Sequence, residues 1–519
     1  MGYYGLSYTW DNRQQGDRNI KLRLDRALVD DKFTECFDNT IINHIQCIQS
    51  DHCALQISVR RSDWVDEGMD GKPFRLENAW TRHERYNQMV EESRQTNVHD
   101  LQGVYEALGG VRDRLKIWSR EEFGSVRKQL KNLRQRLERI RGNSMRSGPC
   151  REEKTLMNKI SELLSREESL ARLRSRAQWL KEGDRNTSFF HAKAKERARI
   201  NKIKYLKRAD GSVVTSQGGL ETEAKSFYQA LFTAHDVTDP ELINQWVAPK
   251  VDDFMNERLC APITNEEVEK ALFMMYPDKS PGPDGFTAGF YIRHWNLLKN
   301  NICEAVRLLL SRGDMPEMVN STVLVLIPKV KNPQEMAQFR PISLCNVLYK
   351  IASKVLALRL RPFLKHIISE EQSAFVPGRL ITDNVLLAYE SIHYLQRKKG
   401  KAGSCAVKLD MAKAYDRVEW SYLRAIMTKL GFAKEWINRV MCCVETVSFS
   451  VRVNGNFSEV FKPSRGIRQG DPISPYLFLL CGEGFSCMLR NYGAGYLSKG
   501  IRVGIHCPWI SHLLFADDC

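Results

Sequence analysis

Residues 513–519 read Leu-Leu-Phe-Ala-Asp-Asp-Cys, an apolar run followed by two adjacent carboxylates. An apolar strand that delivers Asp517 and Asp518 at a tight turn is typical of a metal site. Two neighbouring carboxylates repel each other, and a hard cation such as Mg²⁺ balances them best. A turn needs a strand on each side, and we expect the second strand to be missing, so that Asp518 lacks a partner to hold it.

A third carboxylate, Asp410, ends the short apolar segment Ser-Cys-Ala-Val-Lys-Leu-Asp, which we predict to be a strand over 404–410. Three acids at two strand ends can hold two Mg²⁺ ions about 3.5–4 Å apart, as in nucleotide polymerases. Asp416 competes for this role, but it fits the first turn of a helix better. We therefore predict Asp410, Asp517 and Asp518 as metal ligands and catalytic acids.

Three further side chains suit a nucleotide. Lys329 and Arg340 flank a predicted strand hairpin, where arginine can bind phosphate in a fork and lysine acts as a point charge. Ordinary surface basic residues are the alternative. Tyr415 follows Asp410 by five residues and, at a helix start, can face the same pocket. Its ring would block a ribose 2′-hydroxyl and select deoxynucleotides.

The segment Arg-Gly-Ile-Arg-Gln-Gly-Asp-Pro-Ile-Ser at 465–474 contains a glutamine near two glycines. Gly466 and Gly470 let the backbone around Gln469 approach a substrate closely. Pro472 and Ser474 suit the start of a helix. A plain turn between strand and helix is the alternative.

The second half of the chain alternates strand and helix patterns, which indicates a mixed fold. We predict strands at 322–327 and 448–453, a hairpin turn at Asn454-Gly455, and helices at 348–364, amphipathic, and 420–430. At the N-terminus, 41–45 and 55–59 have strand-like composition.

A strongly basic region lies between these parts. Residues 111–205 contain 27 Lys and Arg against 12 Asp and Glu, a balance of +15 within a chain of net charge +16. Apolar residues at heptad spacing predict a helical hairpin. They are Val126, Leu130, Leu133, Leu137 and Ile140, then Leu156, Ile160, Leu163, Leu170, Leu173, Ala177 and Leu180. The charge favours a nucleic-acid partner, and a solvated coiled-coil spacer is the alternative.

Composition excludes several classes of protein. No apolar run is long enough to cross a membrane, and the N-terminus lacks the pattern of a signal peptide. The 14 cysteines form no Cys-x-x-Cys pair, so we expect no zinc site and mostly buried, reduced thiols. We expect a protein of the nucleus or cytoplasm that is not secreted and does not bind membranes.

Six segments have weak signals individually, but their order along the chain makes the whole pattern highly specific. They are Ser280–Gly285, Phe339–Leu344, Gln372–Arg379, Asp410–Asp416, Gly466–Pro472 and Phe515–Asp518. In this order the chain resembles the reverse transcriptase of non-LTR retrotransposons of the long interspersed type, especially plant-type elements. The resemblance covers most of 175–519, and the stretch Trp179–His191 resembles the segment that precedes the polymerase in such elements.

The resemblance implies an RNA-directed DNA polymerase with a fingers-and-palm fold. Asp410, Asp517 and Asp518 would hold two Mg²⁺ ions, or Mn²⁺. Lys329 and Arg340 would contact the incoming deoxynucleoside triphosphate, and Tyr415 would be the sugar gate. Gln469 and Gly470 would contact template and nucleotide. The partners implied are an RNA template and a DNA primer or target.

Two N-terminal segments, Ile20–Leu28 and Ser50–Leu55, resemble the end of a metal-dependent endonuclease of the exonuclease–endonuclease–phosphatase family. In that family the histidine pairs with the scissile phosphate or its nucleophile, and an aspartate orients it. Those roles would fall to His52 and Asp25, with Asp51 near the metal. A structural Ser-Asp-His is the alternative. A group II intron or telomerase-type polymerase fits these N-terminal segments less well.

We therefore expect an α+β protein with four regions. They are an endonuclease remnant of four-layer α/β type at 1–60, a basic helical linker at 61–205, an N-terminal extension of the polymerase at 206–319, and fingers and palm at 320–519. We expect both ends to cut through domains, so that the thumb is absent. The 519 residues alone would then lack polymerase and nuclease activity, and basic nucleic-acid binding is the alternative function.

Overall fold

A computed structural model covers residues 1–519. It describes all residues except 1–2, 5, 7, 16–17, 29–38, 48–49, 61–73, 78–79, 93–100, 123–125, 143–149, 176–196, 198–199, 235–244, 312–314, 399–404 and 496–499. Ala177 and Leu180 of the predicted helical hairpin and nearly all of Trp179–His191 therefore lie outside the described residues.

The chain divides into two compact units. Unit 1 comprises 1–73, 77–92 and 112–198, and unit 2 comprises 74–76, 93–111 and 199–519. This division by contacts is coarser than the four regions expected from the sequence, which stay predictions.

Unit 1 combines short strands with helices. Its strands are β1 (Tyr3–Tyr4), β2 (Trp10–Asp11), β3 (Lys21–Leu22), β4 (Asn39–Gln46) and β5 (Cys53–Arg60). Its helices are η2 (Trp80–Arg82), α2 (Glu84–Glu92), the second half of α3 (Leu101–Glu122), α4 (Val126–Gly142) and α5 (Arg151–Ser175). β4 pairs with β5 in antiparallel fashion over all eight residues, and β1 pairs with β4 in parallel. The strands predicted at 41–45 and 55–59 are confirmed.

The helical hairpin predicted from the heptad pattern is also confirmed for its described part. α4 ends at Gly142, and α5 begins after Cys150. Leu130 and Leu137 of α4 are buried against Leu156, Ile160 and Leu163 of α5. The two helices bury their apolar stripes against each other, so their charged faces point outward.

Unit 2 contains a four-stranded sheet surrounded by helices. Its strands are β6 (Leu206–Lys207), β7 (Val213–Val214), β8 (Ser321–Pro328), β9 (Phe339–Cys345), β10 (Ser448–Val453) and β11 (Asn456–Phe457). Its helices are the first half of α3, α7 (Gln217–Leu231), α9 (Asp253–Cys260), α10 (Asn265–Phe273), α11 (Ala288–Arg293), α12 (Trp295–Ser311), α13 (Glu317–Asn320), η3 (Met336–Gln338), α14 (Val347–Leu360), η4 (Arg361–Phe363), α15 (Leu364–Ile367), α16 (Ile381–Arg397), η5 (Tyr415–Arg417), α17 (Trp420–Lys429), α18 (Lys434–Glu445) and α19 (Ser474–Gly495).

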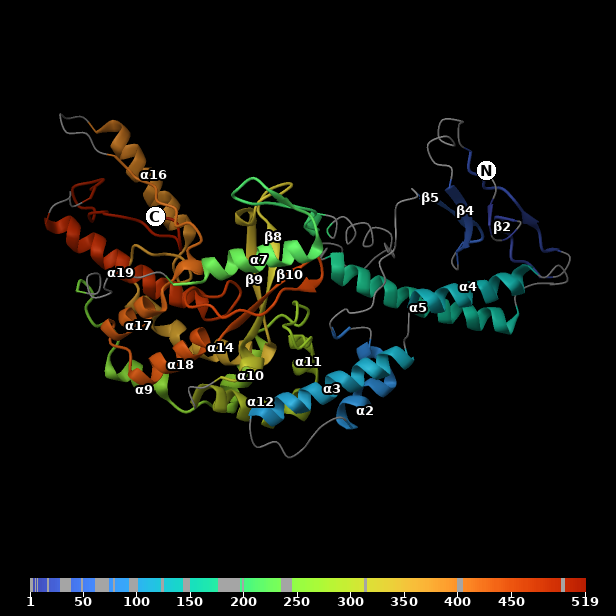
Figure 1. Ribbon diagram of the computed structural model, residues 1–519, viewed down its shortest axis with the longest axis horizontal. Helices are drawn as coiled ribbons and strands as arrows, with labels where there is room; N and C mark the ends of the chain where they lie inside the picture. Colours follow the sequence, from blue (N-terminus) through green and yellow to red (C-terminus); the bar gives the residue numbers. More distant parts are fainter. Residues whose placement is uncertain are drawn as a thin grey trace. The chain divides into compact units, whose positions relative to one another are not determined.

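The main sheet has the order β11-β10-β8-β9. β8 pairs with β9 in antiparallel fashion and with β10 in parallel, and both its faces are largely buried. Leu324 and Leu326 face a core cluster that includes Leu220, Tyr228 and Leu231 of α7. Figure 1 shows α7 lying across the strands. The predicted strands at 322–327 and 448–453 and the helix at 420–430 are confirmed.

The hairpin between β10 and β11 has the turn predicted from Asn454-Gly455. Val453 pairs with Asn456, and both turn residues have positive φ, 53° and 108°. The Asn454 side chain bonds both the N–H and the C=O of Ile203, at 2.9 and 2.8 Å. Residue choice and packing therefore agree at this turn.

The glycine-rich motif at 280–285 packs against the start of α14. The buried side chain of Asn346 accepts a hydrogen bond from Asp284 N–H at 3.1 Å and donates to Met318 O at 2.9 Å. A Cβ on Gly282 would lie 2.5 Å from the backbone nitrogen of Asn346, so only glycine allows the two backbones to come this close.

Two details of the prediction are wrong. The described residues 405–409 form no strand, and Asp410 joins only an isolated bridge, because the pairing with residues 517–519 reaches only 409–411. Val407 and Leu409 stay 70% and 45% exposed. The predicted helix at 348–364 is α14 with two short turns after it. It is buried nearly all round rather than amphipathic, because the helices α9, α10, α12 and α13 pack against it.

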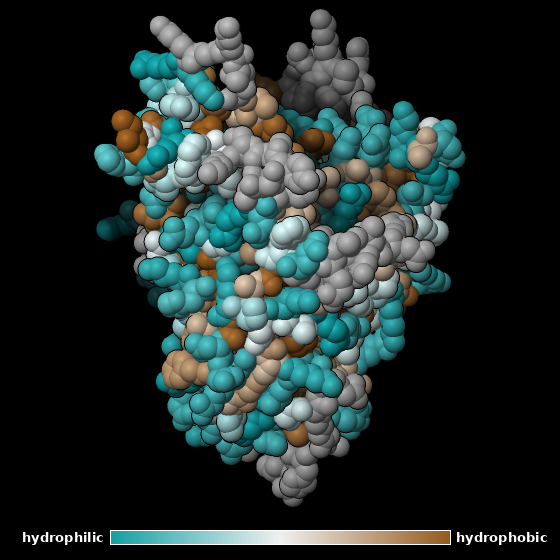
Figure 2. Space-filling model, turned by 90° about the vertical axis from the view of Figure 1, so that its left-hand side faces the viewer, coloured by the Kyte–Doolittle hydropathy of each residue, from teal (hydrophilic) through white to brown (hydrophobic). Residues whose placement is uncertain are grey.

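The described cysteines are all free thiols, and six of them are buried. Cys150, Cys405 and Cys507 are exposed, so the expectation of buried thiols holds only in part. No helix among the described residues is long and apolar enough to cross a membrane. Figure 2 views unit 2 from the end that carries α16 and α19, where apolar side chains lie between hydrophilic ones.

Candidate active site

The two adjacent carboxylates lie on a closed hairpin turn. Phe515 N–H donates to Asp518 O at 2.9 Å, and Asp518 N–H donates to Phe515 O at 3.1 Å. Ala516 and Asp517 form the two-residue loop, and Ala516 has a φ of 55°. A positive φ is strained for alanine, so contacts outside the turn must hold it. We call residues 515–518 the acidic turn.

The acidic turn pairs with the segment that contains Asp410. Leu409 and Cys519 exchange two backbone hydrogen bonds of 2.7 and 3.0 Å, and Met411 N–H donates to Asp517 O at 3.4 Å. The expectation that Asp518 lacks a partner is therefore wrong, because Leu409 and Met411 supply the backbone bonds that a second strand would supply. Asp410 and Asp518 form an antiparallel bridge at a non-hydrogen-bonded position, which places both side chains close together on one face.

The charge of the acidic turn is partly balanced by a lysine. Lys408 Nζ lies 2.9 Å from Asp518 Oδ1, and this hydrogen bond raises the pKa of the lysine. Both side chains are more than half exposed, so the pair is solvated and exchangeable. Among the described residues no three His, Cys, Asp or Glu side chains are already grouped around one metal position. The exposed carboxylates fit a hard cation, whose charge the lysine partly replaces.

Tyr415 lies beside the acidic turn. Its ring stacks on Phe478 with centroids 5.0 Å apart and planes at 11°. Burial raises the pKa of its hydroxyl to about 12, and the Asp517 carboxylate adds to the shift. Its carbonyl accepts from Ile467 N–H at 2.8 Å, which connects it to the 465–474 segment. The structure thus brings Tyr415, Asp517 and this segment together.

Asp416 has a different environment from Asp410. It is 8% exposed, and burial raises its pKa to about 6 against the attraction of Lys413, Lys329 and Arg417. Asp410, in contrast, is exposed. Asp410 is therefore the exposed acid that pairs with the acidic turn, whereas Asp416 is buried.

Lys413 also lies near this site, and the sequence did not predict it as a site residue. Its ammonium lies over the Phe227 ring, 4.1 Å from the centroid, and burial lowers its pKa while Asp416 opposes the shift. Its φ of 55° belongs to the left-handed region. The signal in the sequence was a lysine between Asp410 and Asp416, but nothing there indicated that it would face Lys329.

Lys329 and Arg340 lie at the loop end of the β8–β9 hairpin, where residues 329–338 connect the two strands. Ile327 pairs with Arg340, and Lys329 N–H donates to Gln338 O at 2.8 Å. Both cationic side chains are exposed. Lys329 is close enough to Asp416 and Lys413 to affect the pKa of each. No ion pair between described residues connects Arg340 to the acidic turn.

Gln469 and Gly470 form the tip of a turn that is fixed from both sides. Gln469 O accepts from Ser343 N–H of β9 at 2.9 Å, and Gly470 has a φ of 110°. The buried ion pair Arg468–Asp471, 2.9 Å long, brackets the turn. Arg468 also lies over the Tyr349 ring at 4.0 Å. Arg468 and Asp471 belong to the 465–474 motif, but no role was predicted for them from the sequence.

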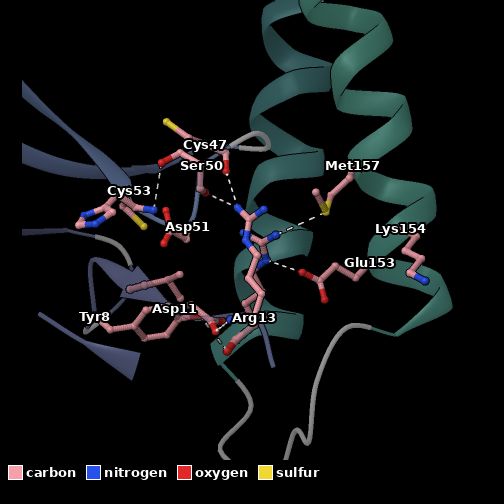
Figure 3. Close-up of a pocket in the computed structure, with 13 residues that line it drawn as sticks. Tyr8, Asp11, Arg13, Cys47, Ser50, Asp51, Cys53, Glu153, Lys154 and Met157 are labelled. Atoms are coloured by element: carbon pink, nitrogen blue, oxygen red, sulfur yellow. Dashed lines mark hydrogen bonds and ion pairs between the residues drawn. The ribbon is translucent and has the colours of Figure 1, made fainter. Parts of the chain in front are cut away.

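The N-terminal candidates lie in unit 1. His52 Nδ1 and Asp25 Oδ2 are 2.9 Å apart, and this hydrogen bond lowers the pKa of Asp25. Trp10 Nε1 donates to Asp51 at 2.8 Å. His52 and Asp51 line a pocket of about 220 Å³, which Figure 3 shows between the strands and the helical hairpin. Arg141 and Glu153, an ion pair of 2.6 Å, line its other side.

Comparisons with known proteins agree with the geometry. A family model described as "Reverse transcriptase (RNA-dependent DNA polymerase)" matches residues 327–519. The "Transposon TX1 uncharacterized 149 kDa protein" of Xenopus laevis is 32% identical over 63% of this chain and 25% of its own length. The "Retrovirus-related Pol polyprotein from type-1 retrotransposable element R2" of Popillia japonica is 30% identical over 50% of this chain and 34% of its own.

A third relative, the "Probable RNA-directed DNA polymerase from transposon BS" of Drosophila melanogaster, is 26% identical over 44% of this chain and 25% of its own length. The chain thus spans about a quarter to a third of the length of these relatives. Residues 327–519 match the reverse transcriptase family, and the chain is similar over a quarter to a third of their length to proteins named for the transposons TX1 and BS and the retrotransposable element R2.

Proposed function

We propose that the chain extends a DNA primer along an RNA template, with Asp410, Asp517 and Asp518 as the metal-binding acids. The backbone pairing of Asp410 with Asp518 carries this proposal, because it brings together two segments, far apart in the sequence, that carry the proposed acids. Bound Mg²⁺, or Mn²⁺, would supply positive charge that activates the primer hydroxyl and stabilises the pyrophosphate leaving group.

The surrounding residues have separate roles in this proposal. Lys329 and Arg340 bind the triphosphate oxygens, and Lys413 supports them from the buried side. Tyr415, held flat by Phe478, excludes a ribose 2′-hydroxyl. The Gln469-Gly470 turn presents backbone to the template–nucleotide pair. Positioning of this kind supplies much of the rate in phosphoryl transfer.

The basic helical hairpin is a second candidate site, for nucleic acid. α4 carries seven basic residues and one acidic residue, and Lys131, Arg136 and Arg139 are exposed while the leucine stripe is buried. A helix with one apolar face and one cationic face suits the phosphate backbone of RNA or DNA. Salt-dependent binding that survives deletion of 270–519 would support this candidate, and binding lost with that deletion would contradict it.

Residues 1–60 are proposed to derive from an endonuclease, supported by the contact of His52 with Asp25. The absence of nuclease activity stays a prediction. Mg²⁺-dependent nicking of supercoiled plasmid by the pure chain, abolished by His52→Ala, would contradict it. A nuclear or cytoplasmic location and the plant-type relationship also stay proposals.

The main test measures metal binding and primer extension together. Mn²⁺ binding to the full chain is followed by electron paramagnetic resonance, and extension is assayed on an RNA template with a DNA primer. Asp410→Ala should remove both Mn²⁺ binding and extension. Glu459 is an exposed acid that follows β11, and Glu459→Gln should change neither. Mn²⁺ binding without extension would contradict the proposed polymerase activity of these 519 residues and leave the metal site standing. Mn²⁺ binding unaffected by Asp410→Ala would contradict the site.

A further inference from the structure

The motif Gln372–Arg379, which has no role in the scheme above, lies next to the acidic turn. We call residues 369–379 the glutamine loop. Its backbone pairs in parallel with the segment that leads into the turn. Leu514 N–H donates to Glu371 O at 2.8 Å, and Ser373 N–H donates to Leu514 O at 3.1 Å. The loop therefore acts as a neighbouring strand for residue 514.

The side chain of Gln372 extends this pairing into the turn itself. It is 3% exposed, and its Oε1 accepts from Ala516 N–H at 3.0 Å and from Ala374 N–H at 3.0 Å. Its Nε2 lies 3.5 Å from Ala516 O. One buried amide thus contacts both backbone groups of Ala516, which is the strained residue of the turn.

Apart from Gln372, the acidic turn is held by backbone hydrogen bonds, which are its own two Phe515–Asp518 bonds and the bonds to Leu409 and Met411. Asp518 is exposed, and Asp517 is partly exposed. The Leu409–Cys519 bonds hold the outgoing side, whereas Gln372 holds the loop residue just before Asp517. A free turn would relax the φ of Ala516 towards negative values, and this rotation would reorient Asp517.

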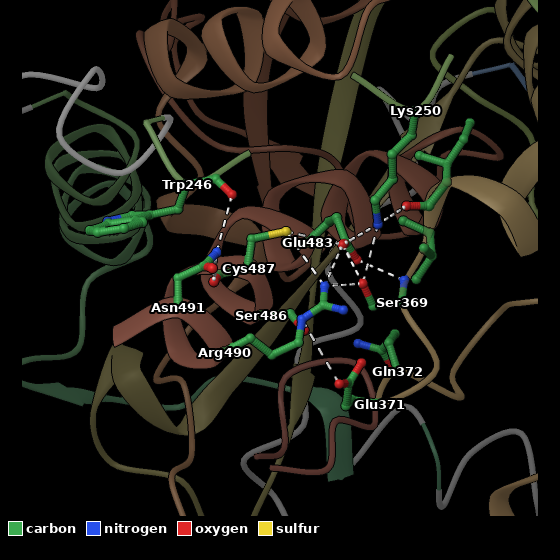
Figure 4. A network of polar contacts seen from close by, with 12 residues as sticks. Trp246, Lys250, Ser369, Glu371, Gln372, Glu483, Ser486, Cys487, Arg490 and Asn491 are labelled. Carbon is green, nitrogen blue, oxygen red and sulfur yellow. Dashed lines mark hydrogen bonds and ion pairs between the residues drawn. The ribbon is translucent and has the colours of Figure 1, made fainter. Parts of the chain in front are cut away.

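The glutamine loop is itself anchored firmly. Arg379 donates to the carbonyls of Gln372 and Ile368 at 2.6 and 2.8 Å. The buried carboxylate of Glu483 accepts from Ser369 N–H at 2.8 Å and pairs with Lys250 at 2.6 Å. Figure 4 shows this network beside Gln372.

The Glu483 carboxylate is charged in this network. Burial alone would raise its pKa, but the hydrogen bonds from Lys250 and Ser369 outweigh burial and hold the pKa below its ordinary value. Its charge is therefore matched by Lys250, and Arg490 lies 3.3 Å away as a second cation. A charged carboxylate whose hydrogen bonds are all satisfied is rigid, so the Glu483 network fixes the loop that carries Gln372.

We propose that Gln372 is a positioning residue of the polymerase site: its amide holds Ala516 in the left-handed conformation and thereby sets Asp517 and Asp518 for metal binding. This inference rests on the proposed function of the acidic turn. Residues that orient metal ligands typically affect metal affinity by about 10–100-fold when they are replaced.

The test compares Gln372→Met with Gln217→Met in the full chain. Gln217 holds the other hairpin turn in a similar way, because its Nε2 donates to Val453 O at 2.9 Å. Mn²⁺ affinity is measured by electron paramagnetic resonance, and folding is measured by thermal unfolding. We expect Gln372→Met to weaken Mn²⁺ binding at least about tenfold and Gln217→Met to leave it unchanged.

A second variant keeps the test decisive if Gln372→Met does not fold. Gln372→Glu retains the oxygen that accepts from Ala516 N–H, so its Mn²⁺ affinity should equal or exceed that of the wild type. Weak binding by a folded Gln372→Glu chain would overturn the inference, as would unchanged binding by folded Gln372→Met. If Asp410→Ala leaves Mn²⁺ binding intact, the proposed metal site itself fails, which separates the two hypotheses.

Discussion

Two hairpin turns in unit 2 begin with a residue at positive φ, for different reasons. The β10–β11 turn uses Asn454 and Gly455 at φ values of 53° and 108°, and the acidic turn uses Ala516 at 55°. Asparagine and glycine tolerate the left-handed region, whereas alanine does not. The first turn is therefore encoded locally, and the second is imposed by Gln372 and by the Leu409–Cys519 pairing.

The difference separates stability from function. The β10–β11 hairpin closes the edge of the main sheet, and its residues all favour its shape. The acidic turn keeps an unfavourable residue and exposed like charges, which is common where a site is built for a ligand. Each prediction below tests one side of this comparison.

The largest effect should come from removing charge at the acidic turn. Asp518→Asn preserves the size of the side chain and the bridge to Asp410 but removes one of the three carboxylate charges. We expect primer extension and Mn²⁺ affinity to fall at least about 100-fold. The carboxylate of Asp518 would help to hold the metal ion, and the metal ion would stabilise the reacting phosphate. Steady-state extension and Mn²⁺ titration measure both.

Glu459→Gln is the matched control for this change. Glu459 is an exposed carboxylate beside β11 and pairs with Lys225 at 2.7 Å, much as Asp518 pairs with Lys408. Equal losses in the two variants would show that the acidic turn has no special role.

The next effect concerns pH near the acidic turn. Asp416 has a pKa of about 6 in the folded chain against an ordinary value of 3.8. The folded state thus binds the proton more tightly than the unfolded state does. This stabilising contribution is complete below pH 3.8 and is lost as the pH rises through 6, a total of about 3 kcal/mol.

Asp416→Asn is neutral at every pH and should remove this dependence. At pH 7 the variant should be more stable than the wild type, and the difference should shrink as the pH falls to 4. Thermal unfolding across this range measures it. A difference that stays constant with pH would show that Asp416 is not buried as described.

A smaller effect should distinguish the two turns directly. Asn454→Ala loses two side-chain bonds to Ile203 and places alanine at positive φ, so the free energy of unfolding should fall by about 2 kcal/mol. Ala516→Gly relieves the backbone strain, so the free energy of unfolding should stay unchanged or rise by up to about 1 kcal/mol. Denaturant unfolding compares them, and equal destabilisation by both changes would contradict the distinction.

The smallest effect concerns the lysine beside the acidic turn. Lys408→Gln removes the cation that pairs with Asp518, so a metal ion no longer competes with it. Mn²⁺ affinity should rise about two- to fivefold at low salt and less at high salt, because exposed pairs are weak and screened. Lys225→Gln, at the matched pair of the other hairpin, should leave Mn²⁺ affinity unchanged.

Local patterns predicted most of the fold that was tested. The strands β4, β5, β8 and β10, the helical hairpin of α4 and α5, and the Asn454-Gly455 turn all follow from periodicity and turn residues. The strand expected at 404–410 failed because strand formation depends on a neighbour, which the composition of the segment does not reveal.

The sequence predicted which acids form the candidate site, and this stays a prediction, but it did not predict the contacts that hold them. Adjacent carboxylates after an apolar run indicate a metal, and the bridge between Asp410 and Asp518 agrees with that. The contacts of Gln372 and Lys413 depend on segments that are distant along the chain. An uncharged glutamine in a loop has no local pattern that indicates its partner.

The hydrogen bond between Gln372 and Ala516 also has a kinetic consequence, because it joins residues 144 positions apart. Closing so long a loop costs entropy before any contact forms, whereas the β10–β11 hairpin can close within microseconds. We therefore expect the acidic turn to be among the last parts of unit 2 to become ordered during folding. A destabilised chain would then lose its catalytic geometry before the β10–β11 hairpin, and activity would decline on heating before that hairpin opens.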